Sequence, residues 1–293
     1  MRVGINLLLW TDEPTRESFL PLYERLARIG YDGLELPIFG GVPERFRVLG
    51  KRLGELGLAR TATTVCPPDA DPIHPDVAVR RAALAHLQRA IDCAEAAGAE
   101  LVGGPLYAAI GKFSGSPPTE HEWEASVDVM QAAADYAARA GITLVFEFLN
   151  RFEIYLLNDA ARTARFARCV ARPNVGVHYD TFHAHIEEKD VSLALESAGA
   201  AIRHVHVSEN DRSTPGSGQV RWAETFAALQ RIGYDGWLTI EAFGAALPSL
   251  AAATRIWRRM FEDEEVLARE GIEFVRRSWV STEPARARIP RMD

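Results

Sequence analysis

Short apolar segments alternate eight times with longer segments of helical periodicity along this chain of 293 residues. The apolar segments are rich in Val, Ile and Leu, as buried parallel strands are, and several of the longer segments end at a glycine that acts as a helix stop signal. The predicted strands are 3–10, 33–36, 59–65, 101–103, 142–148, 175–179, 202–207 and 237–242. The predicted helices are 15–29, 43–56, 74–97, 120–140, 159–170, 191–199, 222–232 and 247–279.

Eight strand–helix units predict the α/β class and a single (β/α)8 TIM barrel. The tetrapeptide Gly-Tyr-Asp-Gly occurs at 30–33 and again at 233–236, each time where a helix ends and a strand begins, which indicates a repeated unit. An open doubly wound sheet is the alternative, but no G-x-G-x-x-G follows the first strand. We expect a catalytic barrel domain over 1–280 and a Pro/Arg-rich tail over 281–293.

Charge and composition argue against several classes of function. The formal net charge is −7, from 33 Lys and Arg against 40 Asp and Glu, which argues against a partner that is nucleic acid or an anionic membrane. No apolar run approaches the roughly 18 residues of a membrane span, and the N-terminus has the pattern of a buried strand instead of a signal peptide. Three scattered cysteines (Cys66, Cys93 and Cys169) are typical of reduced thiols in a cytoplasmic protein.

Four consecutive strands each end in an acid or an imidazole, at the barrel end where active sites lie: Glu147, Asp180, His206 and Glu241. All four are flanked by apolar residues, and three converging buried carboxylates would be very unfavourable without a cation. Three oxygen donors and one imidazole suit Mn²⁺, with Mg²⁺ or Co²⁺ as possible replacements. Taken singly, each acid could instead pair with an arginine, and His206 could be a hydrogen-bonded core residue.

His178 and His204 have the same strand parity as these residues, and for both we expect a structural role. The stretch 108–118 is rich in Gly, Ser and Pro and is either a lid or an inert loop. The loop 215–218 occupies a position where barrels often bind phosphate, but no lysine lies near it, so a free sugar is favoured over a sugar phosphate.

At these residues the sequence resembles the ketose 3-epimerase family, the D-tagatose/D-psicose (D-allulose) 3-epimerases, which are xylose-isomerase-like barrels. The matching stretches are EFLNRFE at 147–153, DTFHAHIEE at 180–188, HVSENDR at 206–212, YDGWLTIEAF at 234–243 and GGPLY at 103–107. The resemblance covers nearly the whole chain, and the NRFE and DTFH stretches are its most specific parts. Family members vary in the stretch after His206, so that only His206 and Arg212 carry over well from it.

The resemblance implies that Glu147, Asp180, His206 and Glu241 are metal ligands and that Glu147 and Glu241 are also the catalytic acid/base pair. It implies that Glu153, His183 and Arg212 hold the ketose end of the substrate. No cofactor beyond the metal is implied. The family forms dimers or tetramers, so we expect a homodimer or a homotetramer.

Inversion at C3 requires a proton to leave the carbon next to the C2 carbonyl and another to return on the opposite face of a planar cis-enediolate, which needs two bases. The metal would stabilise the charge of that enediolate as a Lewis acid. Structural roles are the alternatives to substrate binding: Glu153 could pair with Arg151 or Arg212, and His183 could cap a loop.

Three rival functions remain on the same scaffold. The first is an aldose–ketose isomerase of the hydroxypyruvate-isomerase type, which would move a proton between C1 and C2 with the same two glutamates. A metal-dependent endonuclease would need more histidines and a basic groove. A sugar-binding barrel without catalysis would bind metal and ketose but exchange no proton at C3.

Overall fold

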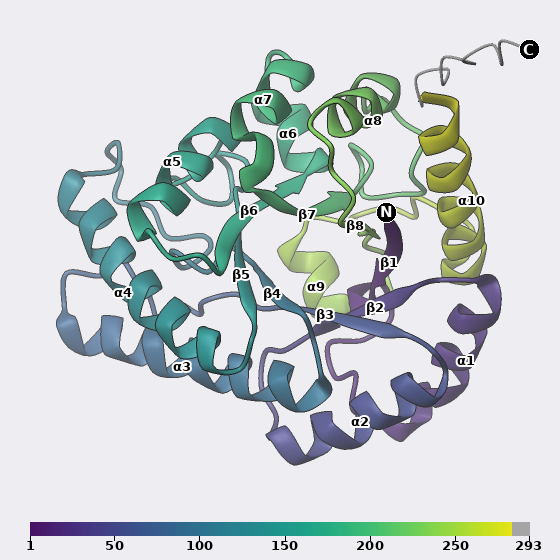
Figure 1. Cartoon of the computed structure of the whole chain (residues 1–293), viewed down its shortest axis with the longest axis horizontal. Coiled ribbons are helices and arrows are strands. Elements are labelled where there is room, and N and C mark those ends of the chain that lie inside the picture. The colour runs from purple at the N-terminus through teal and green to yellow at the C-terminus, as the bar shows by residue number, and fades with distance from the viewer. Residues whose placement is uncertain (283–293) are drawn as a thin grey trace, which may run out of the picture.

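Within residues 1–282, which a computed structural model describes, eight parallel strands close into a barrel in chain order, with β8 paired to β1 (Figure 1). The strands are β1 (Arg2–Asn6), β2 (Gly33–Pro37), β3 (Ala59–Thr63), β4 (Leu101–Gly104), β5 (Thr143–Glu147), β6 (Val175–Asp180), β7 (Ile202–Val207) and β8 (Trp237–Ile240). This topology confirms the predicted single (β/α)8 TIM barrel.

Most of the helices surround the barrel, whereas α9 overlaps the centre of the ring of strands in this view (Figure 1). The helices are α1 (Leu20–Ile29), α2 (Pro43–Glu55), α3 (Val77–Ala97), α4 (Glu120–Arg139), α5 (Ala160–Val170), α6 (Thr181–Glu187), α7 (Val191–Ala198), α8 (Trp222–Arg231), α9 (Pro248–Ala253) and α10 (Glu264–Thr282). Short 3-10 helices are η1 (Leu7–Leu9), η2 (Glu17–Phe19) and η3 (Gly199–Ala201). No helix among residues 1–282 is long and apolar enough to cross a membrane.

The C-terminal helix α10 closes the ring of helices between α8 and α1 (Figure 1), and Arg25 of α1 forms an ion pair with Glu265 of α10 at 2.8 Å. The predicted single helix over 247–279 is wrong, because residues 254–263 between α9 and α10 are not helical. Helix α10 runs to Thr282, two residues into the predicted tail, and the rest of that tail, 283–293, lies outside the described residues.

The sequence pattern did not predict two short helices that directly follow strands, η1 after β1 and α6 after β6. Strand β1 stops at Asn6, four residues before the predicted end, because the Asn6 side chain accepts a hydrogen bond from Leu8 N and begins η1. Asp180 does the same at the end of β6, where its Oδ1 accepts from Phe182 N at 2.7 Å and begins α6. Each of these polar residues therefore ends a strand and turns toward the barrel mouth.

The floor of the barrel is apolar and closed by Trp237, which packs with Leu101 and Val145. Glycine is needed opposite this ring, since a Cβ at Gly33 would lie 2.5 Å from Trp237 Cη2. The Arg2 guanidinium covers the Trp237 ring at 4.1 Å. Side chains two residues further along a strand point to the same face, so the polar groups of the interior gather above this floor.

A bulge in β7 sets which of its side chains point inward. Val177 pairs with Ile202, whereas the next residue, His178, pairs with His204, so Arg203 is an extra residue in β7 and its side chain is exposed. This shift places His204 opposite His178 and His206 opposite Asp180. The histidines of β7 therefore share the barrel interior with the polar residues of β6.

Candidate active site

The structure brings together the four residues predicted at the ends of β5 to β8. One ligand atom from each of Glu147, Asp180, His206 and Glu241 can be chosen so that all four atoms lie within 4.8 Å of one another. His206 Nδ1 lies 3.3 Å from Glu241 Oε1, 3.8 Å from Glu147 Oε1 and 4.0 Å from Asp180 Oδ2. All four side chains are buried, so they form one compact group at the barrel mouth.

Burial and neighbouring charges shift the pKa values of the three acids in this group. Burial raises the pKa of Glu147 well above its ordinary value and raises the pKa of Asp180 to about 6. Burial acts on Glu241 in the same direction, but the charges of His206 and Arg212 outweigh it and hold the pKa of Glu241 below its ordinary value.

The donor set also fits a divalent ion. His206 Nδ1 is buried, faces three carboxylates and has no hydrogen-bond partner among residues 1–282. Carboxylate oxygens with one imidazole nitrogen are suitable ligands for Mn²⁺, Mg²⁺ or Co²⁺. The four residues could therefore hold such an ion, and its charge would offset that of the three acids.

Arg212 reaches into the same group from the loop after β7. Its Nη1 donates to Asp180 Oδ2 at 2.9 Å and to Glu241 Oε2 at 2.5 Å, and its guanidinium lies between the rings of Phe182 and Phe243, at 3.8 and 4.7 Å from their centroids. The Arg212 backbone has a φ of +63°, a conformation that is rare outside glycine and that costs about 1–2 kcal/mol. The surrounding contacts hold this residue in place.

His183 and Glu153 lie beside Arg212 and are linked through Asn150. The Asn150 backbone N–H donates to His183 Nδ1 at 3.0 Å, and Asn150 Nδ2 donates to Glu153 Oε1 at 2.7 Å. Because Nδ1 accepts, neutral His183 carries its proton on Nε2, which faces Arg212 Nη2 at 3.1 Å. Burial, together with the charge of Arg212, holds the pKa of His183 well below its ordinary value. Two donors therefore face each other at this point of the site.

The loop 215–218 is organised by a buried carboxylate, Glu209. Its oxygens accept hydrogen bonds from the backbone N–H groups of Gly216 and Val220 and from Trp222 Nε1, at 2.8, 3.0 and 3.0 Å. An anionic side chain already occupies the N–H groups that a phosphate would use. This arrangement agrees with the preference for a free sugar over a sugar phosphate.

The loop 108–118 is attached at its base to two neighbouring loops. Ala109 N donates to Asp71 Oδ1 at 3.1 Å, Lys112 Nζ lies 3.4 Å from Asp71 Oδ2, and Gly111 N donates to the carbonyl oxygen of Glu153 at 2.8 Å. The loop therefore touches the segment that carries Glu153, as a wall of the site would. Its action as a lid stays a prediction.

Sequence reasoning missed the residues that hold the site from behind. Glu35, Asn6, Asn150 and Glu209 are all buried polar residues, and all contact a predicted site residue or its loop. Glu35 could have been suspected, because an acid surrounded by leucines in a strand needs a buried partner. The alternative pairing of Glu153 with Arg151 does not occur, since Arg151 binds Glu187 at 2.7 Å.

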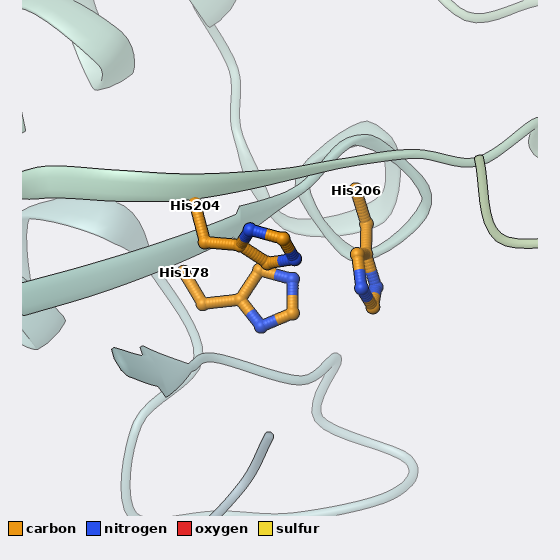
Figure 2. A group of neighbouring side chains, drawn as sticks. All are labelled: His178, His204 and His206. Carbon is orange, nitrogen blue, oxygen red and sulfur yellow. The ribbon is translucent and has the colours of Figure 1, made fainter. Parts of the chain in front are cut away.

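His178 and His204 lie with His206 in a cluster of three imidazoles (Figure 2). The ring centroids of His178 and His206 are 4.0 Å apart, and those of His178 and His204 are 4.6 Å apart, with edge-to-face geometry. Both residues are fully buried, and each lies two residues before a predicted ligand on its own strand, His178 before Asp180 and His204 before His206.

Comparison with known proteins agrees with this geometry. Residues 23–278 match the family model of the xylose isomerase-like TIM barrel. The chain is 31% identical to a ketose 3-epimerase of Arthrobacter globiformis over 94% of the chain and 96% of the relative. It is also 31% identical to an L-ribulose 3-epimerase of Mesorhizobium japonicum, over 94% and 93%. The structure of a D-allulose 3-epimerase from Methylomonas sp. in complex with D-allulose superposes with a TM-score of 0.89, at 30% identity, over 95% of this chain and 97% of that one.

Proposed function

This chain belongs to the xylose isomerase-like TIM barrel family and, within it, to the ketose 3-epimerases, which are isomerases acting on carbohydrates, and we propose that it inverts C3 of a free ketose with Glu147 and Glu241 as its two acid/base residues. The observation that carries this proposal is the convergence of both glutamates, from different strands, in one buried group that fits a divalent cation. The relatives of known activity extend over almost the whole chain, which makes a catalytic barrel a better account than a non-catalytic one.

The reaction needs a base on each face of the sugar. The C3 proton is acidic because the adjacent C2 carbonyl can delocalise the charge that its loss creates. Glu147 at the end of β5 removes or returns the proton on one face, and Glu241 after β8 acts on the other. A divalent ion held by Glu147, Asp180, His206 and Glu241 would supply Lewis-acid stabilisation of the negative charge that develops on oxygen.

The groups beside the glutamates are arranged to orient a sugar. His183 Nε2 and Arg212 Nη2 face each other as donors, so a carbonyl or hydroxyl oxygen of the substrate placed between them would accept from both. Glu153 can accept hydrogen bonds from sugar hydroxyls, and Asn150 holds its carboxylate at 2.7 Å. These contacts would fix which carbon lies between the two acid/base residues.

Product identity after incubation with Mn²⁺ tests this function. A panel of fructose, psicose, tagatose, sorbose and ribulose is separated by chromatography, and the reaction is repeated in deuterated water to follow exchange at C3. We expect a C3 epimer with deuterium at C3. An aldose product would favour the hydroxypyruvate-isomerase-type alternative, and the absence of both turnover and exchange would contradict an enzymatic role.

The two-glutamate mechanism has its own control. Glu241→Gln and Glu147→Gln should each abolish turnover, because each removes one of the two proton-transfer groups. Glu196→Gln replaces a surface carboxylate of α7 that binds Arg231 at 2.9 Å, and it should retain full activity. Retained turnover in Glu241→Gln would contradict the mechanism.

Three finer expectations complete the proposal. Mn²⁺ is the proposed metal because of its match to three carboxylates and one imidazole. A homodimer or homotetramer is proposed from the family resemblance, and metal analysis with sedimentation measurements would test both points. The cytoplasm is the proposed location, in keeping with free thiols at Cys66, Cys93 and Cys169.

A further inference from the structure

Glu35 of β2 lies directly behind the four predicted metal ligands and takes no part in the chemistry described above. Its side chain is fully buried, and both of its oxygens are occupied. Oε1 lies 2.5 Å from His206 Nε2, and Oε2 lies 2.7 Å from His204 Nε2. Thr61 Oγ1 also donates to Oε2, at 3.1 Å. A buried carboxylate with this many polar neighbours is part of an ordered polar network in the barrel interior.

The contact between Glu35 and His206 Nε2 determines whether His206 Nδ1 has a free lone pair. A carboxylate oxygen at 2.5 Å accepts a hydrogen bond, so His206 carries a proton on Nε2. When the ring has only that one proton, the lone pair is on Nδ1, the nitrogen that faces Glu147, Asp180 and Glu241. A carboxylate that holds the far nitrogen of a ligating histidine fixes the orientation of the ring and raises its basicity.

Asn6 connects the same carboxylate to a second predicted ligand. Asn6 Oδ1 accepts from Leu8 N at 2.9 Å, which determines that its Nδ2 points into the barrel. That Nδ2 donates to Glu35 Oε1 at 3.0 Å and to Glu241 Oε1 at 3.1 Å. Glu35 is thus linked to His206 directly and to Glu241 through one amide.

A second metal site among the three histidines is a weaker account of the same residues. Two atoms bound tetrahedrally to one ion at about 2.0–2.1 Å are separated by about 3.3 Å. Glu35 Oε1 and His206 Nε2, at 2.5 Å, are closer than that and are hydrogen-bonded. Glu35 Oε2 and His204 Nε2, at 2.7 Å, are also too close to share one ion, although they do not form a hydrogen bond. The contacts of Glu35 therefore favour a supporting role for the three histidines shown in Figure 2.

We propose that Glu35 is a positioning residue that keeps the proton of His206 on Nε2 and so presents Nδ1 as a metal ligand, with Asn6 extending this control to Glu241. The inference rests on the proposed function, because it concerns the metal that this function requires. It assigns a role to an acid of the second strand, 171 residues away from His206 in the chain.

Metal affinity of the intact chain tests the proposal. Glutamine at position 35 has nearly the same shape but offers one acceptor oxygen in place of two. We expect Glu35→Gln to raise the Kd for Mn²⁺, measured by calorimetric titration of metal-free protein, by about 10- to 100-fold. Asp71→Asn is the matched control, because Asp71 is also a buried carboxylate but contacts none of the four ligands; its Kd for Mn²⁺ should equal that of the unaltered chain.

The outcomes separate this inference from the function it rests on. If the unaltered chain does not bind Mn²⁺, the proposed metal-dependent function fails. If it binds one ion and Glu35→Gln binds with the same Kd, only the role of Glu35 is refuted. Two ions per unaltered chain would also overturn the inference, in favour of a second site at His178, His204 and His206.

A spectroscopic measurement reports on the proton itself, and its first result comes from the unaltered chain. In ¹⁵N-labelled, Mg²⁺-loaded protein, we expect His206 to show a strongly hydrogen-bonded proton on Nε2 and none on Nδ1. That resonance should shift or disappear in Glu35→Gln and persist in Asp71→Asn. A His206 proton on Nδ1 in the unaltered protein would refute the proposal.

Discussion

Replacement of Glu209 by glutamine should release the loop that carries Arg212. Each Glu209 oxygen accepts two hydrogen bonds: Oε1 from Asn210 N and Val220 N, and Oε2 from Gly216 N and Trp222 Nε1. An amide keeps one oxygen and directs an NH₂ group at the other two donors. Two N–H groups thereby lose their acceptor, at about 1–3 kcal/mol each, so the loop should be destabilised by about 2–6 kcal/mol.

Hydrogen exchange measured by mass spectrometry gives the local free energy directly. A loss of 2 kcal/mol corresponds to an increase of about 30-fold in the exchange rate of amides that open locally, since 1.4 kcal/mol is a factor of ten. We expect this increase in peptides covering residues 209–222 and little change in peptides from α3. The catalytic effect should follow, because Arg212 N donates to the carbonyl oxygen of Glu209 at 2.9 Å, and kcat/KM should fall by about 100-fold.

Asp211→Asn is the control in the same loop. Asp211 Oδ1 accepts from Ser213 N and Ser213 Oγ, but its side chain is only partly buried, and an amide oxygen can keep these bonds. Its exchange rates and kcat/KM should stay close to those of the unaltered chain. Equal exchange in Glu209→Gln and the unaltered chain, or an equal increase in both variants, would refute the argument that Glu209 organises the loop.

Three further perturbations have expected results. Gly50→Ala in α2 should lower the melting temperature, because the new Cβ would lie 2.3 Å from the Ala97 carbonyl oxygen and overpacking costs about 1–3 kcal/mol. Gly54→Ala should raise the melting temperature slightly, because its Cβ would meet nothing closer than 3.9 Å. Equal changes in the two variants would contradict this prediction. Burial lowers the pKa of His86. Its contribution to the free energy of unfolding is therefore present above pH 6.5 and is lost as pH falls through the folded-state pKa. In urea unfolding, His86→Gln should lose less stability between pH 7 and 5 than the unaltered chain does. Saturation with Mn²⁺ at 100 times its Kd should add about 2.7 kcal/mol to the free energy of unfolding, and a chelator should reverse the gain; a melting temperature indifferent to Mn²⁺ would argue against the metal site.

Much of the barrel was predictable because each buried strand carries its own local signal. Apolar runs such as Val3–Ile5 and Leu144–Phe146 are visible without any knowledge of their neighbours, and glycine stops such as Gly30 and Gly98 end helices through their positive φ. The element α6 was not predicted, since seven residues are too few to show a helical period. The break between α9 and α10 was also missed, because the intervening residues have no proline or glycine to interrupt the pattern.

The group of four candidate ligands was predictable for a topological reason. In a parallel barrel the carboxyl ends of all strands meet at one mouth, so acids that end successive strands must lie near one another. Glu147, Asp180 and Glu241 were found in this way, and the structure places them around His206. Their use as metal ligands and proton-transfer groups stays a prediction until the experiments above are done.

The chain by itself determined the order of strands and helices and the residues that end each strand, because periods of 2 and 3.6 residues are local properties of the backbone. Only the tertiary structure decided how the interior side chains pair. The bulge at Arg203 turns His204 and His206 inward, and closure of the ring brings Asn6 of β1 against Glu241 after β8. Such pairings depend on register between strands far apart in sequence, and packing of the whole barrel sets that register.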